Sequence, residues 1–238
     1  MSGRDRSVYQ LYQMLWAGLD LVYPPTCVSC GKRGVRWCDR CFAKIQIIHP
    51  PVCEACGCKL GAAGYCPDCR YSRPKYTALR SWANFSGPVQ QALHGLKYRR
   101  DISLGEYLSR PLIQLLSQSG WPVDIVVPVP LGLARQKERG YNQVAYIARP
   151  LALGLGWRYL PNALSRERET QSQVGLTIEQ RRENVRDAFV SRSNLVAQRR
   201  VLLVDDVMTT GATIDACTSA LLAVGAKEVY AITVARAI

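Results

Sequence analysis

Cysteine pairs dominate the first third of the sequence. Nine of the ten cysteines lie between residues 27 and 69, and eight of these form four C-x-x-C motifs. Each motif places two thiolates where one tetrahedral ion, with Zn–S distances of ~2.3 Å, can take both, and two motifs complete a four-cysteine site. Such closed sites are structural, because they leave no open position for a reactant. The spacing therefore predicts two structural Zn²⁺ ions.

Sequential pairing is the simplest arrangement of these ligands, although the spacing also permits interleaved pairing. In sequential order the first site takes Cys27, Cys30, Cys38 and Cys41, and the second takes Cys53, Cys56, Cys66 and Cys69. We expect Cys58 and Cys217 to be small hydrophobic residues. A disulfide framework is less favoured because the N-terminal residues show no secretion signal, and a thioredoxin-like role is less favoured because tandem motifs have no βαβ context.

Basic and aromatic side chains are interspersed with the cysteines. The whole chain carries a formal net charge of +13, which suits a polyanionic partner. Basic groups mixed with aromatic rings can bind phosphates and stack on bases. The candidate nucleic-acid-binding residues are Arg33, Arg36, Trp37, Arg40, Lys97, Arg99 and Arg100. The alternative is that the residues near the cysteines neutralise the thiolate clusters and cover a thin core.

A second group of side chains with chemical potential follows the apolar run Val201–Val204. Residues 205–213 are expected to form a loop between a buried strand and a helix over 212–224. The start of that helix, with the hydroxyls of Thr209, Thr210 and Thr213 and the small Gly211, favours a phosphate monoester. Loops in this position, at the carboxyl end of a strand, are where α/β sheets bind ligands.

Asp205 and Asp206 would repel a phosphate unless they hold something else. Two carboxylates can accept hydrogen bonds from the diol of a ribose, and Mg²⁺ could bridge between them. The segment 201–238 is accordingly acidic, with four acidic and two basic residues in a basic protein. Carboxylates beside a phosphate cradle therefore indicate a ribose 5-phosphate ligand.

The elements that must position these groups alternate between strands and helices. The strand–helix–strand unit at the C-terminal end implies a parallel sheet and an α/β fold. The expected strands cover 78–85, 124–130, 157–161, 201–204 and 228–234, and the expected helices cover residues from 87, 103–118, 141–154 and 212–224.

The chain divides into three segments. Residues 1–25 carry an amphipathic helix that ends at Pro24 and Pro25 and that we expect to dock on its own protein in preference to a membrane surface. Residues 26–75 form the cysteine module and residues 76–238 the α/β domain, with 76–122 as a candidate hood. No apolar run reaches the about 18 residues of a membrane span, so we expect a cytoplasmic protein.

Two resemblances follow from these motifs. The segment VLLVDDVMTTGAT resembles the phosphoribosyl pyrophosphate (PRPP) motif of type I phosphoribosyltransferases. The whole chain resembles the ComF family of bacterial proteins linked to natural competence. That resemblance is carried by the cysteine motifs, Leu96-Lys97-Tyr98, Arg139-Gly140-Tyr141-Asn142-Gln143, and a run of Arg, Thr, Gln, Asn and Phe positions between Arg168 and Phe189. Arg99-Arg100 departs from the pattern, which has a glycine nearby.

The resemblance implies a type I phosphoribosyltransferase-like parallel sheet with an N-terminal double zinc-ribbon module. It implies that Asp205 and Asp206 hold the ribose hydroxyls and serve catalysis, and that Mg²⁺ accompanies PRPP. The turn Thr209, Thr210, Gly211, Ala212 and Thr213 would bind the 5-phosphate, and Arg135, Lys137 and Arg139 the pyrophosphate. Residues 166–187 would form a mobile flap, although a solvated helix explains them too.

The resulting functional hypothesis is a competence protein that binds PRPP and single-stranded DNA during DNA uptake. Other proteins of the competence machinery are candidate partners. Two alternatives remain open: a metabolic phosphoribosyltransferase with a nucleobase or amine acceptor, and a non-catalytic PRPP sensor. The sequence identifies no acceptor.

Overall fold

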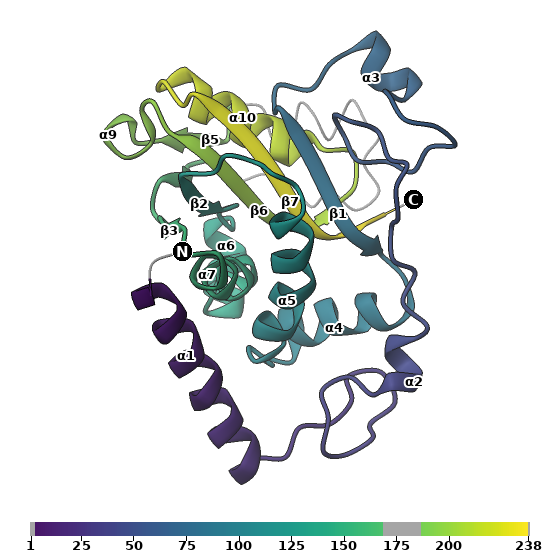
Figure 1. Ribbon diagram of the computed structural model, residues 1–238. Helices are drawn as coiled ribbons and strands as arrows, with labels where there is room; N and C mark the ends of the chain where they lie inside the picture. Colours follow the sequence, from purple (N-terminus) through teal and green to yellow (C-terminus); the bar gives the residue numbers. More distant parts are fainter. Residues whose placement is uncertain (1–2, 169–186, 238) are drawn as a thin grey trace.

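A five-stranded parallel sheet lies at the centre of the computed structural model, which describes residues 3–168 and 187–237 (Figure 1). Every neighbouring pair in the sheet is parallel. Its order is β1 (Ala78–Asn84), β7 (Glu228–Arg236), β6 (Arg200–Met208), β2 (Ile125–Pro128) and β3 (Arg158–Tyr159). The fold is therefore the α/β class that the alternating elements predict, with a core on each face of the sheet.

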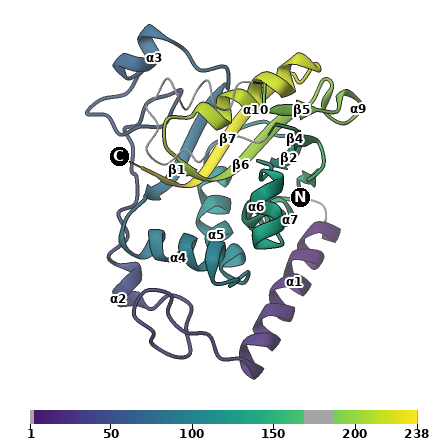
Figure 2. The same ribbon diagram turned by 180° about the vertical axis from the view of Figure 1, so that it is seen from behind.

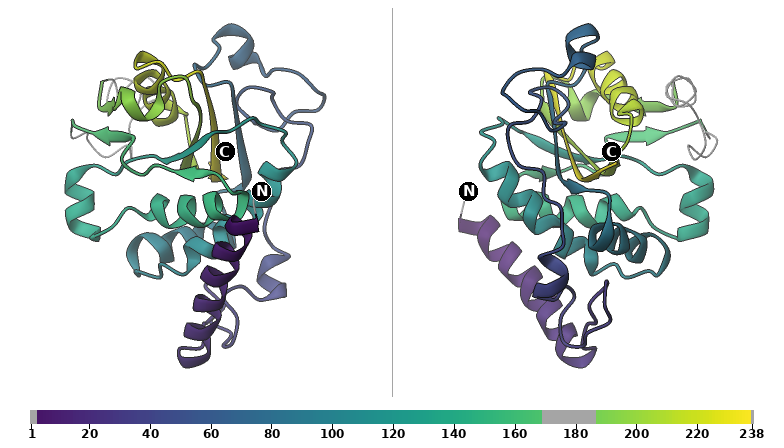
Figure 3. Two further views of the ribbon diagram at one scale, coloured as in Figure 1. Left: turned by 60° about the vertical axis from the view of Figure 1, so that its left-hand side comes forward. Right: turned by 90° about the vertical axis from the view of Figure 1, so that its right-hand side faces the viewer.

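Helices cover both faces of the sheet (Figures 1 and 3). One face packs against α4 (Gly87–Tyr98), α5 (Leu104–Ser117) and α7 (Gln143–Leu155). The other face packs against α10 (Ala212–Ala223) and the antiparallel pair β4 (Leu164–Arg166) and β5 (Phe189–Ser191), which the short α9 (Ser193–Val196) follows. A further helix, α6 (Leu133–Arg139), joins β2 to α7. The expected strands and helices of the α/β domain are all present, but α6, α9, β4 and β5 were not expected.

Strand β6 shows why the interior strands are apolar on both sides. Leu202 and Val204 lie in the core with α4, α5 and α7, whereas Val201 and Leu203 lie in the core with α10. Side chains alternate between faces along a strand, so a strand that is covered on both faces is apolar throughout.

The strand expected over 201–204 is longer than predicted. It continues to Met208, because β7 supplies ladder partners as far as the pair Met208 and Arg236. Asp205 and Asp206 therefore lie within a strand, rather than in the loop to which the sequence assigned them.

The segment 76–122, interpreted as a candidate hood, lies in the core. Its strand β1 pairs with β7, and its helices α4 and α5 cover one face of the sheet. The reason is that β1 completes the sheet edge, so the segment has no separate lobe to form. The end of α4 nevertheless reaches the acidic residues of β6, as described below.

The cysteine module runs along the β1 edge of the sheet, with α3 (Pro67–Tyr71) at one end and α2 (Asp39–Phe42) at the other (Figures 1 and 2). The N-terminal helix α1 (Gly3–Val22) lies against α7. Its docking is partial, because Leu11 and Leu15 remain 59% and 63% exposed. No helix in the described ranges has both the length and the apolarity to cross a membrane.

Most of the predicted flap over 166–187 lies outside the described residues. The motif positions between Thr170 and Val185 belong to that part of the chain. Arg166 and Arg168 are described, and Arg166 lies over the ring of Phe189 at 5.5 Å.

Candidate functional site

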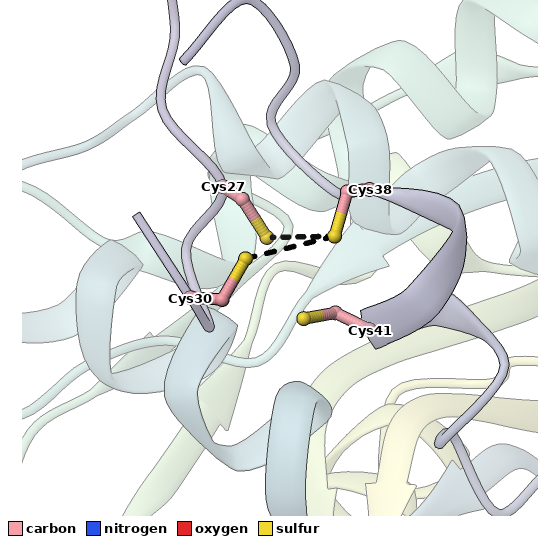
Figure 4. Close-up of side chains that lie close together, drawn as sticks. All are labelled: Cys27, Cys30, Cys38 and Cys41. Carbon is pink, nitrogen blue, oxygen red and sulfur yellow. Dashed lines mark hydrogen bonds between the residues drawn. The ribbon is translucent and has the colours of Figure 1, made fainter. Parts of the chain in front are cut away.

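The first cysteine cluster has the ligands and the pairing that the spacing favours. The sulfur atoms of Cys27, Cys30, Cys38 and Cys41 all lie within 4.8 Å of one another (Figure 4). The Sγ–Sγ distance is 3.8 Å between Cys27 and Cys38 and 3.6 Å between Cys30 and Cys38. A tetrahedron with Zn–S bonds of ~2.3 Å has edges of ~3.8 Å, so the four thiols fit one Zn²⁺.

The second cluster gathers five cysteines. The sulfur atoms of Cys53, Cys56, Cys58 and Cys66 lie within 4.8 Å of one another, with 3.8 Å between Cys56 and Cys66. Cys69 is buried in the same cluster. This cluster also fits Zn²⁺, and it includes Cys58, which the sequence assigned to ordinary packing. By contrast, Cys217 is fully buried in the core beneath α10, as expected.

In each cluster, backbone amides favour the ionised form of one thiol. Burial opposes ionisation of Cys27 and Cys53, but backbone N–H groups donate to their sulfurs and lower the pKa of both to about 6. In Cys53, one of these donors is the amide of Cys66, at 3.4 Å. Metal ligands must be deprotonated, so this arrangement favours metal binding at neutral pH.

The second cluster is bonded directly to the sheet edge. The amide of Leu79 donates to the carbonyl of Ala55 at 2.7 Å. The Arg80 guanidinium donates to the carbonyls of Cys53 and Glu54 at 3.3 and 3.1 Å, and Arg236 donates to the carbonyl of Cys56. The knuckle that carries the ligands therefore continues the hydrogen bonding of β1.

Two of the predicted nucleic-acid-binding residues have structural partners instead. Arg36 pairs with Asp20 of α1, lies 3.7 Å from Asp101, and has a side chain only 11% exposed. Trp37 packs against Trp82 of β1, with 6.0 Å between ring centroids. These contacts hold the first cluster and α1 to the domain. Trp37 has the covering role weighed as the alternative, whereas Arg36 pairs with carboxylates and not with the thiolates.

The other basic residues predicted to bind nucleic acid differ in their exposure to solvent. Arg33, Arg40, Arg99 and Arg100 are exposed. Lys97 is not at the surface with them, because its ammonium lies 2.7 Å from Oδ2 of Asp206 and its side chain is 17% exposed. Lys97 therefore belongs to the acidic site.

Three motifs meet at Asp206. Besides the Lys97 ammonium, the side-chain amide of Gln143 donates to Oδ2 of Asp206 at 2.9 Å. The Tyr141 hydroxyl donates to the carbonyl of Leu96, and the Arg139 guanidinium lies 5.0 Å from the ring centroid of Tyr98. Residues 96–98, 139–143 and Asp206 thus meet at the carboxyl end of β6, where Gln143 and Asp206 are buried and Tyr98 is exposed.

The two carboxylates do not face the same side of the sheet. Asp206 faces α4 and α7, through Lys97 and Gln143. Asp205 faces α10: burial and then the charge of Asp205 raise the pKa of Cys217 on that helix. Neighbours in a strand point to opposite faces, so the two carboxylates have different surroundings.

Asp205 and Asp206 also differ in pKa, because their surroundings differ. Burial, followed by the charge of Asp206, raises the pKa of Asp205 to about 7. Burial would likewise raise the pKa of Asp206, but the charge and hydrogen bond of Lys97 lower it, with a further hydrogen bond from Gln143. Asp206 is thus the carboxylate that stays ionised at neutral pH.

The hydroxyl-rich turn lies directly between β6 and α10. Gly211 precedes the helix with a φ of +81°, a left-handed conformation that favours glycine. Thr209 is exposed, and the Ala212 amide donates to Oγ1 of Thr210 at 3.4 Å. Together with Thr213 in the first turn of the helix, this is the arrangement of amides and hydroxyls that a phosphate requires.

The predicted pyrophosphate residues also differ in their surroundings. Arg135 and Lys137 are exposed on α6. Arg139, at the end of α6, donates to Oε1 of Gln143 at 2.9 Å, and its Nε is buried without a hydrogen-bond partner in the structure. Arg139 therefore belongs with the Asp206 group, whereas the other two reach solvent.

Sequence reasoning missed the partners of Asp206. Gln143 was not a candidate, and Lys97 was assigned to nucleic-acid binding. The one available signal was that both lie in motifs quoted for the family resemblance.

Comparisons with known proteins define the class. Residues 18–70 match the double zinc ribbon domain, and residues 137–238 match the phosphoribosyl transferase domain. Among solved structures, glutamine PRPP amidotransferase from B. subtilis, complexed with ADP and GMP, aligns with a TM-score of 0.42 and 20% identity, over 59% of this chain and 30% of that chain. The two family matches define the chain as a double zinc ribbon joined to a phosphoribosyltransferase-type α/β domain.

Similar curated proteins give the family. Competence protein F of Haemophilus influenzae is 30% identical over 74% of this chain and 80% of its own. DNA utilization protein YhgH of Salmonella typhi is 34% identical over 69% of this chain and 74% of its own. The chain belongs to the ComF family of competence proteins.

Proposed function

We propose that this protein binds PRPP, with Mg²⁺, at the carboxyl end of β6 and that it binds single-stranded DNA through its exposed arginines. The observation that carries the first part is Asp206. It is a buried carboxylate that is held by Lys97 and Gln143 and lies three residues before the threonine-rich turn that opens α10. In a sugar phosphate, the hydroxyls of the sugar can donate to the Asp206 carboxylate, and the phosphate can accept hydrogen bonds from the turn that opens α10.

Different residues of the site would bind the ribose, the 5-phosphate and the pyrophosphate of PRPP. Asp206, with Asp205 behind it, accepts hydrogen bonds from the ribose, and residues Thr209–Thr213 surround the 5-phosphate. Arg139 and the exposed Arg135 and Lys137 supply cations for the pyrophosphate. The donor set suits Mg²⁺, which prefers carboxylate and phosphate oxygens, and the low pKa of Asp206 keeps that carboxylate charged. Mg²⁺ would neutralise charge on the pyrophosphate as it leaves.

The proposal that the protein binds single-stranded DNA is supported by its positive charge and by the names of similar proteins. The chain carries a net charge of +13, and Arg33, Arg40, Arg99 and Arg100 are exposed. The two relatives are named for competence and for DNA utilization. We therefore assign the protein to DNA uptake in the cytoplasm, with PRPP as either a substrate or a signal.

Calorimetry tests the PRPP site. We expect saturable binding of PRPP with Mg²⁺ to the full chain and its loss in Asp206→Asn, since the neutral amide has one acceptor oxygen instead of two and no charge to pair with Lys97 or to attract Mg²⁺. The matched control is Asp124→Asn, which removes a carboxylate that pairs with Arg200 at the opposite end of β6. Unchanged binding in Asp206→Asn would refute the site. Pyrophosphate release with a panel of bases and amines then separates an enzyme from a sensor.

Salt dependence tests the DNA site. Affinity for a single-stranded oligonucleotide should fall steeply between 50 and 200 mM salt, by about 10³ for about six phosphate contacts. Arg99→Gln with Arg100→Gln should lower the affinity and the salt slope. The control is Arg199→Gln with Lys227→Gln, two exposed cations near the amino ends of β6 and β7. Equal losses in both double variants would show that binding follows net charge and not this surface.

A further inference from the structure

The second cysteine cluster holds one thiol more than a tetrahedral ion can use. Cys53, Cys56 and Cys66 lie within 4.8 Å of each other and of Cys58. Cys69 is buried in the same cluster as Cys53 and Cys66. Among the described residues, the first cluster groups four thiols, which is the number that a structural ion requires.

Both extra positions are suited to a ligand. Cys69 is only 4% exposed and lies in the middle of α3, three residues after Cys66, which precedes the helix. Cys58 lies one residue beyond Gly57, and its carbonyl accepts a hydrogen bond from the amide of Cys53 at 2.8 Å. That bond closes the knuckle and keeps the Cys58 side chain beside the common ligands.

From this geometry we infer that Cys58 and Cys69 compete for the fourth coordination position of the second zinc ion, while Cys53, Cys56 and Cys66 are constant ligands. Zinc is four-coordinate in structural sites but can expand to five ligands, so one thiolate can enter as the other leaves. The exchange makes and breaks one Zn–S bond, and the displaced sulfur can take up a proton. The first ion has no such alternative among the described thiols.

Zinc content gives the first test, on the full chain purified with its metal. We expect two zinc ions per chain in the wild type, in Cys58→Ala and in Cys69→Ala, because either residue can complete the site. The variant that lacks both should retain one ion. Cys217→Ala, which removes a buried thiol of α10 that lies in the core of the sheet, should retain two.

Three results would overturn the inference: one ion in Cys69→Ala, one ion in Cys58→Ala, or two ions in the variant that lacks both. The first cluster serves as an internal standard for folding, since a variant that misfolds as a whole loses both ions. A variant with no zinc is therefore recognised, and its zinc-loaded refolded form is measured instead.

Cadmium spectroscopy gives a second readout that does not depend on occupancy. With ¹¹³Cd in both sites, each ion should resonate as a four-sulfur complex in the wild type. In Cys69→Ala the second resonance should stay in the four-sulfur region, because Cys58 replaces the lost ligand. A shift of that resonance to a complex of three sulfurs and one oxygen would show that Cys58 does not reach the metal and would overturn the inference.

Discussion

The cysteine clusters and the Asp206 group are both sets of ionisable side chains gathered away from water, but they are assembled in different ways. In the first cluster, all four ligands come from residues 27–41, in two knuckles of fixed spacing. The Asp206 group draws on α4, α7 and β6, so its members are separated by 46 and 63 positions, as the residue numbers 97, 143 and 206 show. One site is local in the chain, and the other exists only when the sheet has formed.

This difference determines what each site depends on. The clusters have little apolar material of their own and require an ion, whose binding energy is the folding energy of such modules. The Asp206 group requires no ion, because Lys97 already neutralises the carboxylate. We therefore expect the two regions to respond separately to metal removal and to mutation.

Metal removal should have the largest effect. Loss of an ion from a closed site costs on the order of 10 kcal/mol of folding free energy, so a strong chelator should unfold residues 26–75. Strands β6 and β7 and helix α7 should keep their amide protection, because their core is apolar. Hydrogen exchange followed by mass spectrometry measures both regions in one sample.

Restoring Zn²⁺ is the control for this experiment, and it should return protection to residues 26–75. If the chelator unfolds the whole chain in one transition, the two regions are a single cooperative unit and the distinction between them fails. The bonds from Leu79 and Arg80 to the second knuckle make the first residues of β1 the place where an intermediate response is expected.

Breaking the Lys97–Asp206 pair should have the next largest effect. Lys97→Met leaves a buried carboxylate without its cation, at a cost of about 3 kcal/mol in the free energy of unfolding. Adding Asp206→Asn to that variant should recover most of the loss, since the unpaired charge is gone. Urea unfolding of the two single variants and the double variant measures this coupling. Lys137→Met, on the exposed face of α6, is the matched control, and additive losses would contradict the pairing.

The same contrast explains what the sequence could predict. The ribbon ligands follow from C-x-x-C spacing, and the α/β fold follows from the strand–helix alternation. The partners of Asp206 could not be predicted, because strand order decides which loops meet at one edge. The length of β6 was underestimated because its last residues are held in the strand by pairing with β7. Asp205 and Asp206 therefore lie within a strand, and their side chains point to opposite faces of the sheet. The partners of Arg36 were not predicted either, because Asp20 and Asp101 come from other parts of the chain.

The pH dependence of stability should report on Asp205. Its pKa is raised to about 7, so between about pH 4 and pH 7 the folded protein holds a proton that the unfolded chain has lost. Stability should therefore fall as pH rises through this window, by at most about 1.4 kcal/mol per pH unit, and should level off above it. Because zinc ligands also titrate, the measured quantity is the difference between wild type and Asp205→Asn in urea at pH 6 and pH 8.

Asp205→Asn removes the ionisable group, so it should gain on the wild type as pH rises from 6 to 8. A constant difference between the two proteins would show that Asp205 titrates normally and that its burial beside α10 has no electrostatic consequence. Asp206→Asn should show a smaller gain, because it removes the charge of Asp206 but leaves the burial that raises the pKa of Asp205.

Two glycines test, with the smallest expected effects, whether each cysteine cluster folds independently of the sheet. Gly31 and Gly57 follow the first knuckle of each ribbon, with φ values of +75° and +71°. A β-carbon at Gly31 would meet nothing within 4 Å, but at Gly57 it would lie 2.5 Å from the carbonyl oxygen of Leu79 in β1. Gly31→Ala should cost about 1 kcal/mol, from the left-handed backbone alone. Gly57→Ala should cost about 1–3 kcal/mol more, because a backbone atom must move. Thermal unfolding of the zinc-loaded variants compares them, and equal losses would mean that the second ribbon folds as independently of the sheet as the first.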